Sequence, residues 1–343
     1  MKKTVIFMLF ISIPFLFSGC DLVDNLTGKK DDGNKNVIHP VLLNGKWGYI
    51  NSKGQIAVNP AFDDARPFSD GMAPVRVGTL WGYVDAATSS LAIEPIFATA
   101  GDFGDGLAPV QLPGQPYGYI DKRGNFVVEP AFDFASPFSE GLAAVRTDGL
   151  WGYIKKDASF LFTPKYSSAR AFSDGLAAVE NFEGWVYINK SGSEVINPTF
   201  RIASAGEFVD GIAPIQTAEG WGYINKSGNL LITPKYSEAG RFSQDRAWIR
   251  SGNFIGFIDK NEKMIVEPQF AEVRSFSEDM AAVRLNNSWF YISRKNNLVT
   301  ISQPFTNADS FRDGIARVTI GSGQNARYGY IDKKGDYIWF PTR

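Results

Sequence analysis

The segment Trp151-Gly152-Tyr153-Ile154 returns along the chain at a nearly constant spacing. The first residues of its nine copies are Trp47, Trp81, Tyr117, Trp151, Trp185, Trp221, Ile255, Trp289 and Tyr328. Successive copies lie 34, 36, 34, 34, 36, 34, 34 and 39 residues apart, and a fixed period in this range is typical of a tandem array. A proline recurs in step with the copies, from Pro60 to Pro341. The sequence therefore predicts nine repeats of one structural unit.

A third marker keeps the same frame. An aromatic residue followed by a turn, as in Phe68-Ser69-Asp70-Gly71 and Phe172-Ser173-Asp174-Gly175, appears eight times, once between each pair of copies. The combined motif resembles the WG-containing repeat family, or KWG-type repeat, which is found widely in bacterial surface and envelope proteins. The resemblance covers roughly residues 40 to 343. It implies a repeat scaffold and brings no catalytic residue with it.

Each repeat is expected to fold as a meander of three strands. The second strand is the WGYI segment, whose two faces are both apolar, so it should be central and buried on two sides. Turns such as 51–54 lead to the third strand and are typical of a type I turn closed by a left-handed glycine. In the return loop 131–141, Phe132, Ala135 and Phe138 are spaced by three. That spacing predicts a helical turn between neighbouring sheets.

Substitutions inside the repeat indicate the backbone conformation. Val186 and Phe290 replace the glycine of WGYI, so this position needs no positive φ, and the glycine is expected to make room for a neighbouring ring. Asp245 and Asp279 replace the glycine that closes the aromatic turn. Aspartate is among the few residues that adopt the left-handed conformation.

The fold class predicted is all-β, a tandem array of about nine three-stranded WG repeats. The array begins with a first strand near Val41 and ends with a third strand at Phe340, so no strand is left over to interlock the ends of a ring. This favours an open or spiral array. A β-propeller-like ring is the alternative, because short strands and an 11-residue return loop also suit a propeller blade.

The N-terminal region is predicted to carry a targeting signal. Residues 1–19 combine Lys2 and Lys3 with an apolar run of the length of a secretion signal, and Ser18-Gly19-Cys20 looks like a bacterial lipoprotein signal with Cys20 as the lipidated residue. An ordinary cleaved signal is the alternative. Residues 20–36 have the composition of a flexible tether, and residues 37–343 form the WG-repeat domain. A lipid anchor in the cell envelope, at the outer membrane or cell surface, follows as an expectation, although Asp21 would favour inner-membrane retention in some Gram-negative bacteria.

Composition narrows the chemistry. Thirty-five basic and 36 acidic side chains give no charge signal for nucleic acid. With one cysteine and one histidine, His39, the chain cannot form an internal disulfide or a zinc site of the usual kind, and a Ser-His-Asp apparatus would depend on His39. We expect His39 to be a solvated residue at the start of the array. No metal, cofactor or nucleic-acid partner is predicted.

Three sets of side chains recur with the repeat, and we interpret each as structural and give a functional role as the alternative. The Trp and Tyr of WGYI should be core, with a sugar-binding ladder as the alternative. The acids of the aromatic turns, such as Asp70 and Glu140, should serve turn chemistry, with glycosidase carboxylates or calcium ligands as the alternative. Lysines and arginines of the turns between second and third strands, such as Lys122, should form a solvated basic rim, with contact to anionic glycans or lipid headgroups as the alternative.

Two segments that break the repeat are the candidate binding residues, because no structural need explains them. They are Gln111 to Pro116 and Thr319 to Arg327, both between first and second strands. The residues proposed for contact are Gln111, Gln115, Tyr117, Gln324, Asn325 and Arg327. The function predicted is a non-catalytic envelope lipoprotein whose scaffold binds a protein or glycan partner. A carbohydrate-active enzyme and a passive spacer are the alternatives.

Overall fold

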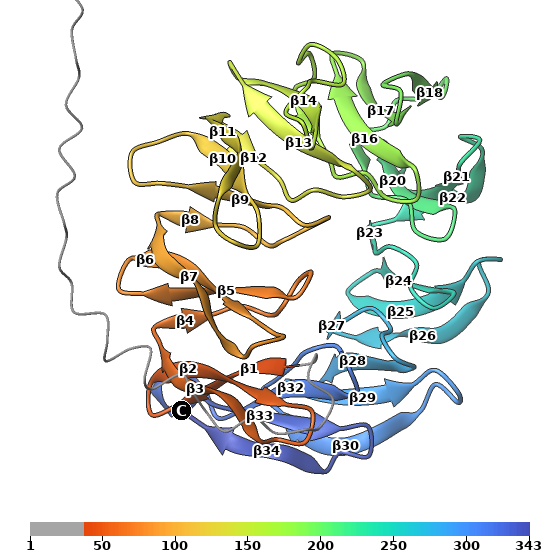
Figure 1. Ribbon diagram of the computed structural model, residues 1–343. Coiled ribbons are helices and arrows are strands. Elements are labelled where there is room, and N and C mark those ends of the chain that lie inside the picture. The colour runs from red at the N-terminus through yellow and green to blue at the C-terminus, as the bar shows by residue number, and fades with distance from the viewer. Residues whose placement is uncertain (1–37) are drawn as a thin grey trace, which may run out of the picture.

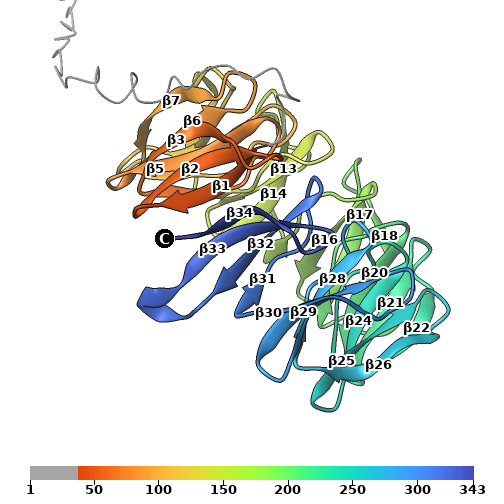
Figure 2. The ribbon, with the colours of Figure 1, turned by 90° about the horizontal axis from the view of Figure 1, so that it is seen from below.

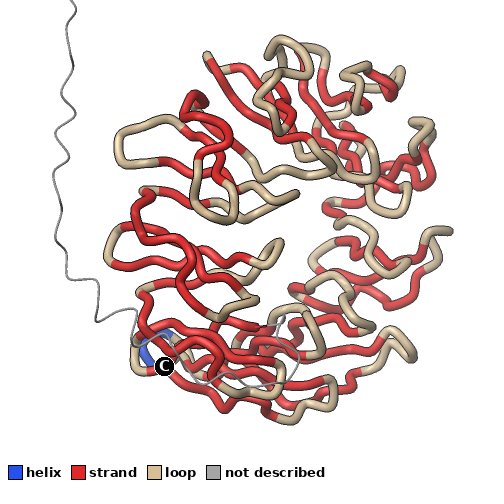
Figure 3. Tube along the Cα trace, viewed as in Figure 1, coloured by secondary structure: helices blue, strands red, loops and turns tan. Residues whose placement is uncertain are grey.

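A computed structural model describes residues 38–343, which form nine small antiparallel sheets arranged in a ring, a nine-bladed β-propeller (Figure 1). The predicted signal segment, Cys20 and the tether lie outside the described residues. Strands follow one another around the whole ring, and the described part of the chain contains one short 3-10 helix (Figure 3). The all-β tandem array is therefore confirmed.

The blades follow the repeat order. The first blade holds β1 (Ile38–Leu43), β2 (Lys46–Asn51) and β3 (Ile56–Phe62). The second holds β4 (Asp64–Ala65), β5 (Met72–Val77), β6 (Leu80–Asp85) and β7 (Ser90–Phe97), and the third β8 (Thr99–Ala100), β9 (Ala108–Gln111), β10 (Tyr117–Ile120) and β11 (Phe126–Phe132). The fourth holds β12 (Phe134–Ala135), β13 (Leu142–Thr147) and β14 (Leu150–Lys155), and the fifth β15 (Ser168–Ala169), β16 (Leu176–Asn181), β17 (Gly184–Asn189) and β18 (Glu194–Ile196). The sixth holds β19 (Ser204–Ala205), β20 (Ile212–Thr217), β21 (Gly220–Asn225) and β22 (Leu230–Tyr236). The seventh holds β23 (Glu238–Ala239), β24 (Arg246–Ser251), β25 (Phe254–Asp259) and β26 (Met264–Phe270), and the eighth β27 (Glu272–Val273), β28 (Met280–Leu285), β29 (Ser288–Ser293) and β30 (Val299–Phe305). The ninth holds β31 (Asn307–Ala308), β32 (Ile315–Ile320), η1 (Gly323–Asn325), β33 (Arg327–Asp332) and β34 (Tyr337–Thr342).

The return loop between blades contains a strand where we expected a helical turn. In the loop 131–141 the residues Phe134 and Ala135 form β12, which pairs with β13 of the same blade. The spacing of three has a different cause. Phe132 ends one blade, Ala135 is in the short strand and Phe138 is in the following turn, and all three enter the same core cluster.

The WGYI strand supplies the core, as predicted, and is central in every blade except the fourth, where only isolated bridges such as Trp151 to Tyr166 lie on the outer side of β14. In the second blade β6 pairs with β5 on one side and β7 on the other, and Tyr83 and Val84 are fully buried. The glycine of WGYI has ordinary strand geometry, but the group that it makes room for is the bulged third strand. A Cβ on Gly48 would lie 2.5 Å from the Val58 carbonyl oxygen and 2.6 Å from Pro60 N.

The ring closes without a shared strand, so the open array favoured by the sequence is not what the structure shows. β1 and β33 lie side by side (Figures 1 and 2). The turn glycine Gly54 abuts the backbone of Ile338 in the ninth blade, and the equivalent Gly335 abuts the side chain of Ile301 in the eighth. Blade-to-blade packing therefore continues across the seam between the last and the first blade.

Hydroxyl groups of the ninth blade bond to the edge of β1 at this seam. In the second blade, the carbonyls of Pro74 and Arg76 accept hydrogen bonds from Arg66 N and Asp63 N, which flank the short strand β4. The equivalent carbonyls of the first blade accept from side chains of the ninth: Tyr330 Oη donates to Pro40 O at 2.7 Å, and Thr342 Oγ1 donates to Leu42 O at 2.5 Å. The exposed edge of β1 is thus capped from the other end of the chain.

Candidate functional site

Each blade after the first is preceded by an entry turn, the name used here for the aromatic turn of the sequence motif. The eight entry turns are 68–71, 103–106, 138–141, 172–175, 208–211, 242–245, 276–279 and 311–314. The aromatic ring of each turn packs edge-on against the WGYI tyrosine of the preceding blade, or against Phe257 in the seventh. Phe68 on Tyr49 and Phe172 on Tyr153 are examples, both with ring centroids 4.9 Å apart. Asp245 and Asp279 have the left-handed conformation that was predicted.

The entry turns are also joined to one another by hydrogen bonds. The serine hydroxyl of one turn donates to the aromatic residue's carbonyl in the next, as from Ser69 to Phe103 O at 2.8 Å. The acid of one turn accepts the glycine N–H of the next, as Asp70 Oδ2 does from Gly106 at 2.6 Å. Glycosidase chemistry is thus not needed to explain these periodic acids, because a structural role already engages them.

The lysines of the predicted basic rim are paired with these acids at the same end of the strands. Lys122 lies 2.9 Å from Asp70, Lys226 lies 2.6 Å from Asp174, and Lys333 lies 3.0 Å from Glu278. The hydrogen bond from Lys226 is the main cause that holds the pKa of Asp174 below its ordinary value. Acids of the entry turns therefore neutralise part of the rim, while other basic residues of the rim, such as Arg123, form no ion pair among residues 38–343.

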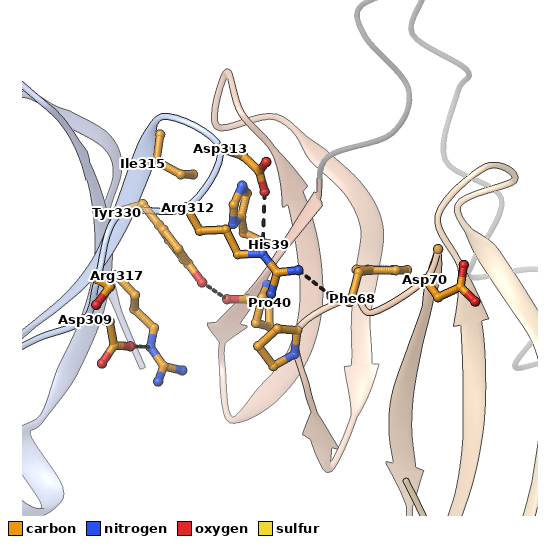
Figure 4. A pocket seen from close by; sticks show the side chains of 13 residues that line it. His39, Pro40, Phe68, Asp70, Asp309, Arg312, Asp313, Ile315, Arg317 and Tyr330 are labelled. Carbon is orange, nitrogen blue, oxygen red and sulfur yellow. Dashed lines mark hydrogen bonds and ion pairs between the residues drawn. The ribbon is translucent and has the colours of Figure 1, made fainter. Parts of the chain in front are cut away.

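The eight entry turns belong to the described part of the chain, and the residues that precede the first blade lie outside it. A pocket of about 350 Å³ lies at the seam between the ninth blade and the first (Figure 4). Its lining residues come from the first blade, the first and eighth entry turns with their flanking residues, and the ninth blade: His39, Pro40, Pro67, Phe68, Asp70, Gly71, Asp309, Ser310, Arg312, Asp313, Ile315, Arg317 and Tyr330.

His39 stands in this pocket and is buried, so the expectation of a solvated residue is wrong. Its side chain is 7% exposed, and Nε2 has no hydrogen-bond partner among the described residues. In the strand register His39 faces Ile50 as Ala73 faces Val84, so it replaces the alanine of the other eight repeats. Its ring centroid lies 5.6 Å from that of Tyr330. Burial lowers the pKa of His39, against an opposite effect of the Asp313 carboxylate.

Two arginines from the ninth blade flank the pocket. Arg312 takes the serine position of its entry turn, and its Nη2 donates to Phe68 O at 2.7 Å (Figure 4). The long side chain thus joins the eighth entry turn to the first. Arg317 is paired with Asp309 at 2.8 Å. Asp313 is half exposed and lies 3.7 Å from Arg312 Nε, and no described backbone N–H donates to its carboxylate.

The predicted binding segments lie elsewhere. Gln111, Gln115 and Tyr117 belong to the β9–β10 connection of the third blade, and Gln324, Asn325 and Arg327 belong to the β32–β33 connection of the ninth. The first and second blades separate the two segments around the ring, so the structure does not bring them together. Both lie at the opposite ends of the strands from the entry turns. Tyr117 packs on Phe134 at 5.6 Å, whereas Gln324, Asn325 and Arg327 are exposed.

Sequence reasoning missed the seam pocket, although two signals point to it. Alignment of the repeats places Asn34 to Val37 where an entry turn would stand, without the aromatic residue or the glycine. The same alignment places His39 where every other repeat has alanine. Because the array was expected to be open, the two ends were not considered as one site.

Residues 38–343 contain no group of three or more His, Cys, Asp or Glu side chains that could hold a metal ion. No helix in this part of the chain is long and apolar enough to cross a bilayer.

Comparison with known proteins supports the fold and the repeat. The chain is similar to a eukaryotic initiation factor structure (12% identity, 88% of this chain and 95% of that chain covered, TM-score 0.65). It is also similar to the computationally designed Ika8 protein (13% identity, 78% and 95% covered, TM-score 0.52). At these identities the likeness concerns the fold alone. No curated protein matches the sequence. The WG containing repeat matches residues 47–79, 81–114, 117–151, 151–182, 185–219, 221–253 and 255–289, more than half of the chain. The chain therefore belongs to the WG-containing repeat family.

Proposed function

We propose that the protein is a non-catalytic scaffold of the bacterial cell envelope that binds a protein or glycan partner. It would be held at the membrane by a lipid on Cys20 and by the tether 20–36. The observation that carries the binding role is the seam pocket, where Nε2 of the buried His39 has no hydrogen-bond partner among residues 38–343. Buried polar groups normally have partners, so an unpaired one facing a pocket suggests a ligand.

The proposed membrane anchor and envelope location rest on the sequence alone. The apolar run before Cys20 and the polar segment after it are the features that support lipidation and tethering. A Cys20→Ser variant expressed in the native host tests this part separately. Loss of membrane association and of lipid label on the chain is expected, and retention of both would contradict the anchor.

Affinity capture tests the binding role. The chain is used as bait against solubilised envelope proteins and glycans, beside three variants: scrambled 111–116, scrambled 319–327 and Asp313→Ala. A saturable partner that is retained by the first two variants and lost with Asp313→Ala places binding at the seam. Loss with either loop variant instead places it at the loops predicted from the sequence. If no saturable partner is captured from either fraction, the scaffold proposal fails.

A further inference from the structure

Three aromatic rings form a continuous row across the third and fourth blades. Phe134, the first residue of β12, contacts both Tyr117 of β10 and Trp151 of β14, with ring centroids 5.6 Å and 5.4 Å apart. The Phe134 side chain is 41% exposed, and the other two residues are half-buried. This aromatic row is therefore accessible to solvent, next to the exposed loop residues 113–116.

An arginine beside the aromatic row lacks the acid that its counterparts have. In three other blades an acid in the short strand faces an arginine in the strand register and forms an ion pair with it: Asp64 with Arg76, Glu238 with Arg250, and Glu272 with Arg284. In the fourth blade Phe134 replaces the acid and faces Arg146. Arg146 is exposed, and its side chain forms no ion pair or hydrogen bond with any of residues 38–343.

The strand register places this arginine on the same surface as the rings. Arg146 faces Phe134 on one side and Trp151 on the other, and residues directly opposite each other on neighbouring strands share one face of a sheet. Neither acid of this segment is paired with Arg146. Asp133 accepts a hydrogen bond from Gly149 N–H at 3.3 Å, and Asp148 lies in the hairpin turn after β13.

The combination of groups indicates the class of ligand. An unpaired guanidinium recognises a carboxylate through paired hydrogen bonds, and exposed aromatic faces pack against the apolar faces of pyranose rings. The exposed Gln115, two residues before Tyr117, offers an amide that can bond to sugar hydroxyls. An extended peptide would instead need an open strand edge, whereas β13 is paired on both sides.

We propose that the aromatic row and Arg146 bind an acidic saccharide, a chain of pyranose rings that carry carboxylates. Arg146 pairs with one carboxylate, and Phe134 and Trp151 support the ring that carries it. Tyr117 packs against the next unit of the saccharide. This inference names a ligand class for the binding role proposed above and therefore rests on it, but it places the ligand away from the seam pocket.

The probe is a hexamer of galacturonic acid, titrated into the full chain in detergent and followed by calorimetry. Saturable binding at one site is expected, and it should weaken as the concentration of NaCl is raised. The fully methyl-esterified hexamer keeps the pyranose rings without their charge, so it should bind about tenfold more weakly or less. Failure of the acidic hexamer to bind, or equal binding of the esterified hexamer, would overturn the proposal.

A peptide of six glutamates tests the alternative occupant. It carries carboxylates without pyranose rings, so it should show no saturable binding. If the peptide binds as tightly as the galacturonic acid hexamer, the surface belongs to acidic peptides and the saccharide assignment is wrong.

Matched variants of the arginine locate the site. Arg146→Gln removes the charge and should weaken binding of the hexamer by about tenfold. Arg250→Gln removes an arginine at the same register position of the seventh blade, where Glu238 already pairs with it, and should leave binding unchanged. Equal effects of the two variants would contradict the assignment to the fourth blade.

Variants of Phe134 separate binding from stability. Phe134→Glu introduces the acid found in the seventh and eighth blades, so it removes the ring and gives Arg146 a partner. Binding should be lost while circular dichroism shows that the chain remains folded. Phe134→Tyr keeps the ring and should bind within about twofold of the parent chain. Unchanged binding by folded Phe134→Glu, or loss of binding by folded Phe134→Tyr, would contradict the role of the ring.

Affinity capture distinguishes failure of this inference from failure of the proposed function. If the galacturonic acid hexamer does not bind but the chain captures a saturable envelope partner, this inference is refuted and the scaffold function stands. If neither the hexamer nor any envelope partner binds, both are refuted. A captured glycan that the hexamer displaces, and that Arg146→Gln no longer retains, would support both.

Discussion

Tyr330→Phe removes the hydroxyl that joins the last blade to the first. Tyr330 is 4% exposed, and its Oη donates to Pro40 O at 2.7 Å. The substitution leaves the ring packing in place and takes one buried hydrogen bond away. A net loss of about 1–2 kcal/mol in the free energy of unfolding is expected, because the Pro40 carbonyl loses an inter-blade donor inside the protein.

The matched control is Tyr153→Phe at an internal junction. Tyr153 is fully buried, and its Oη donates to Arg170 O at 2.6 Å. Both variants and the parent chain are unfolded in urea, and their free energies of unfolding are compared provided that the dependence on urea concentration, the m-value, is the same for all three. In a closed ring the two losses should agree to within about 0.5 kcal/mol, since each variant removes one inter-blade hydrogen bond of the same kind.

An open array gives a different result. If the first and last blades were apart in solution, Tyr330 would face water and its hydroxyl would contribute nothing measurable. Tyr153→Phe would then destabilise the protein while Tyr330→Phe would not. That outcome would refute the contact across the seam and, with it, the pocket.

Three other changes test parts of the same account. Phe257→Tyr supplies the hydroxyl that the seventh blade lacks, next to the Arg274 carbonyl at the position equivalent to Arg170, and should raise the free energy of unfolding by about 0.5–1.5 kcal/mol in urea titration; a loss would show that the junction has no room. Gly222→Ala places a Cβ 2.5 Å from the Ile232 carbonyl oxygen and should cost about 1–3 kcal/mol by overpacking, whereas no cost would contradict the close strand approach. Burial lowers the pKa of His39 in the folded chain from its ordinary value of 6.5. The unfolded chain therefore binds a proton at this histidine more readily than the folded chain does, so the free energy of unfolding should fall as pH decreases from 7.5 to 5. Thermal unfolding of His39→Ala should lack that part of the decrease, and identical pH profiles would contradict the burial.

Much of the blade could be predicted because each feature depends on local sequence. The alternation in WGYI placed the tyrosine and the β-branched residue on two buried faces, and the turn glycines such as Gly54 and Gly124 have the expected positive φ. The glycine of WGYI was also assigned an ordinary strand conformation correctly. Where Val186 replaces it, the third strand β18 is short and loses the pairing near Trp185 that other blades have at this position.

The arrangement of the blades could not be predicted in the same way. Closure involves Tyr330 and Thr342, whose hydroxyls donate to the carbonyls of Pro40 and Leu42, 290 and 300 residues earlier in the chain. The strand count indicated that no strand is left over to interlock the two ends, and none of the described strands does so. The count did not consider that side-chain hydrogen bonds could join the last blade to the first. The seam pocket was not predicted for the same reason, because His39 and Asp313 are neighbours only in a closed ring.

The distance between the two ends of the array tests the central claim most directly. Spin labels are placed on Lys53→Cys and Lys334→Cys, exposed residues at the same turn position of the first and ninth blades, in a chain with Cys20→Ser. Labels on Ser191→Cys and Ser227→Cys, at that position in the adjacent fifth and sixth blades, give the reference. A closed ring predicts the same narrow distance distribution by pulsed electron paramagnetic resonance for both pairs. A longer and broader distribution for the first pair alone would contradict closure and remove the basis for the seam site.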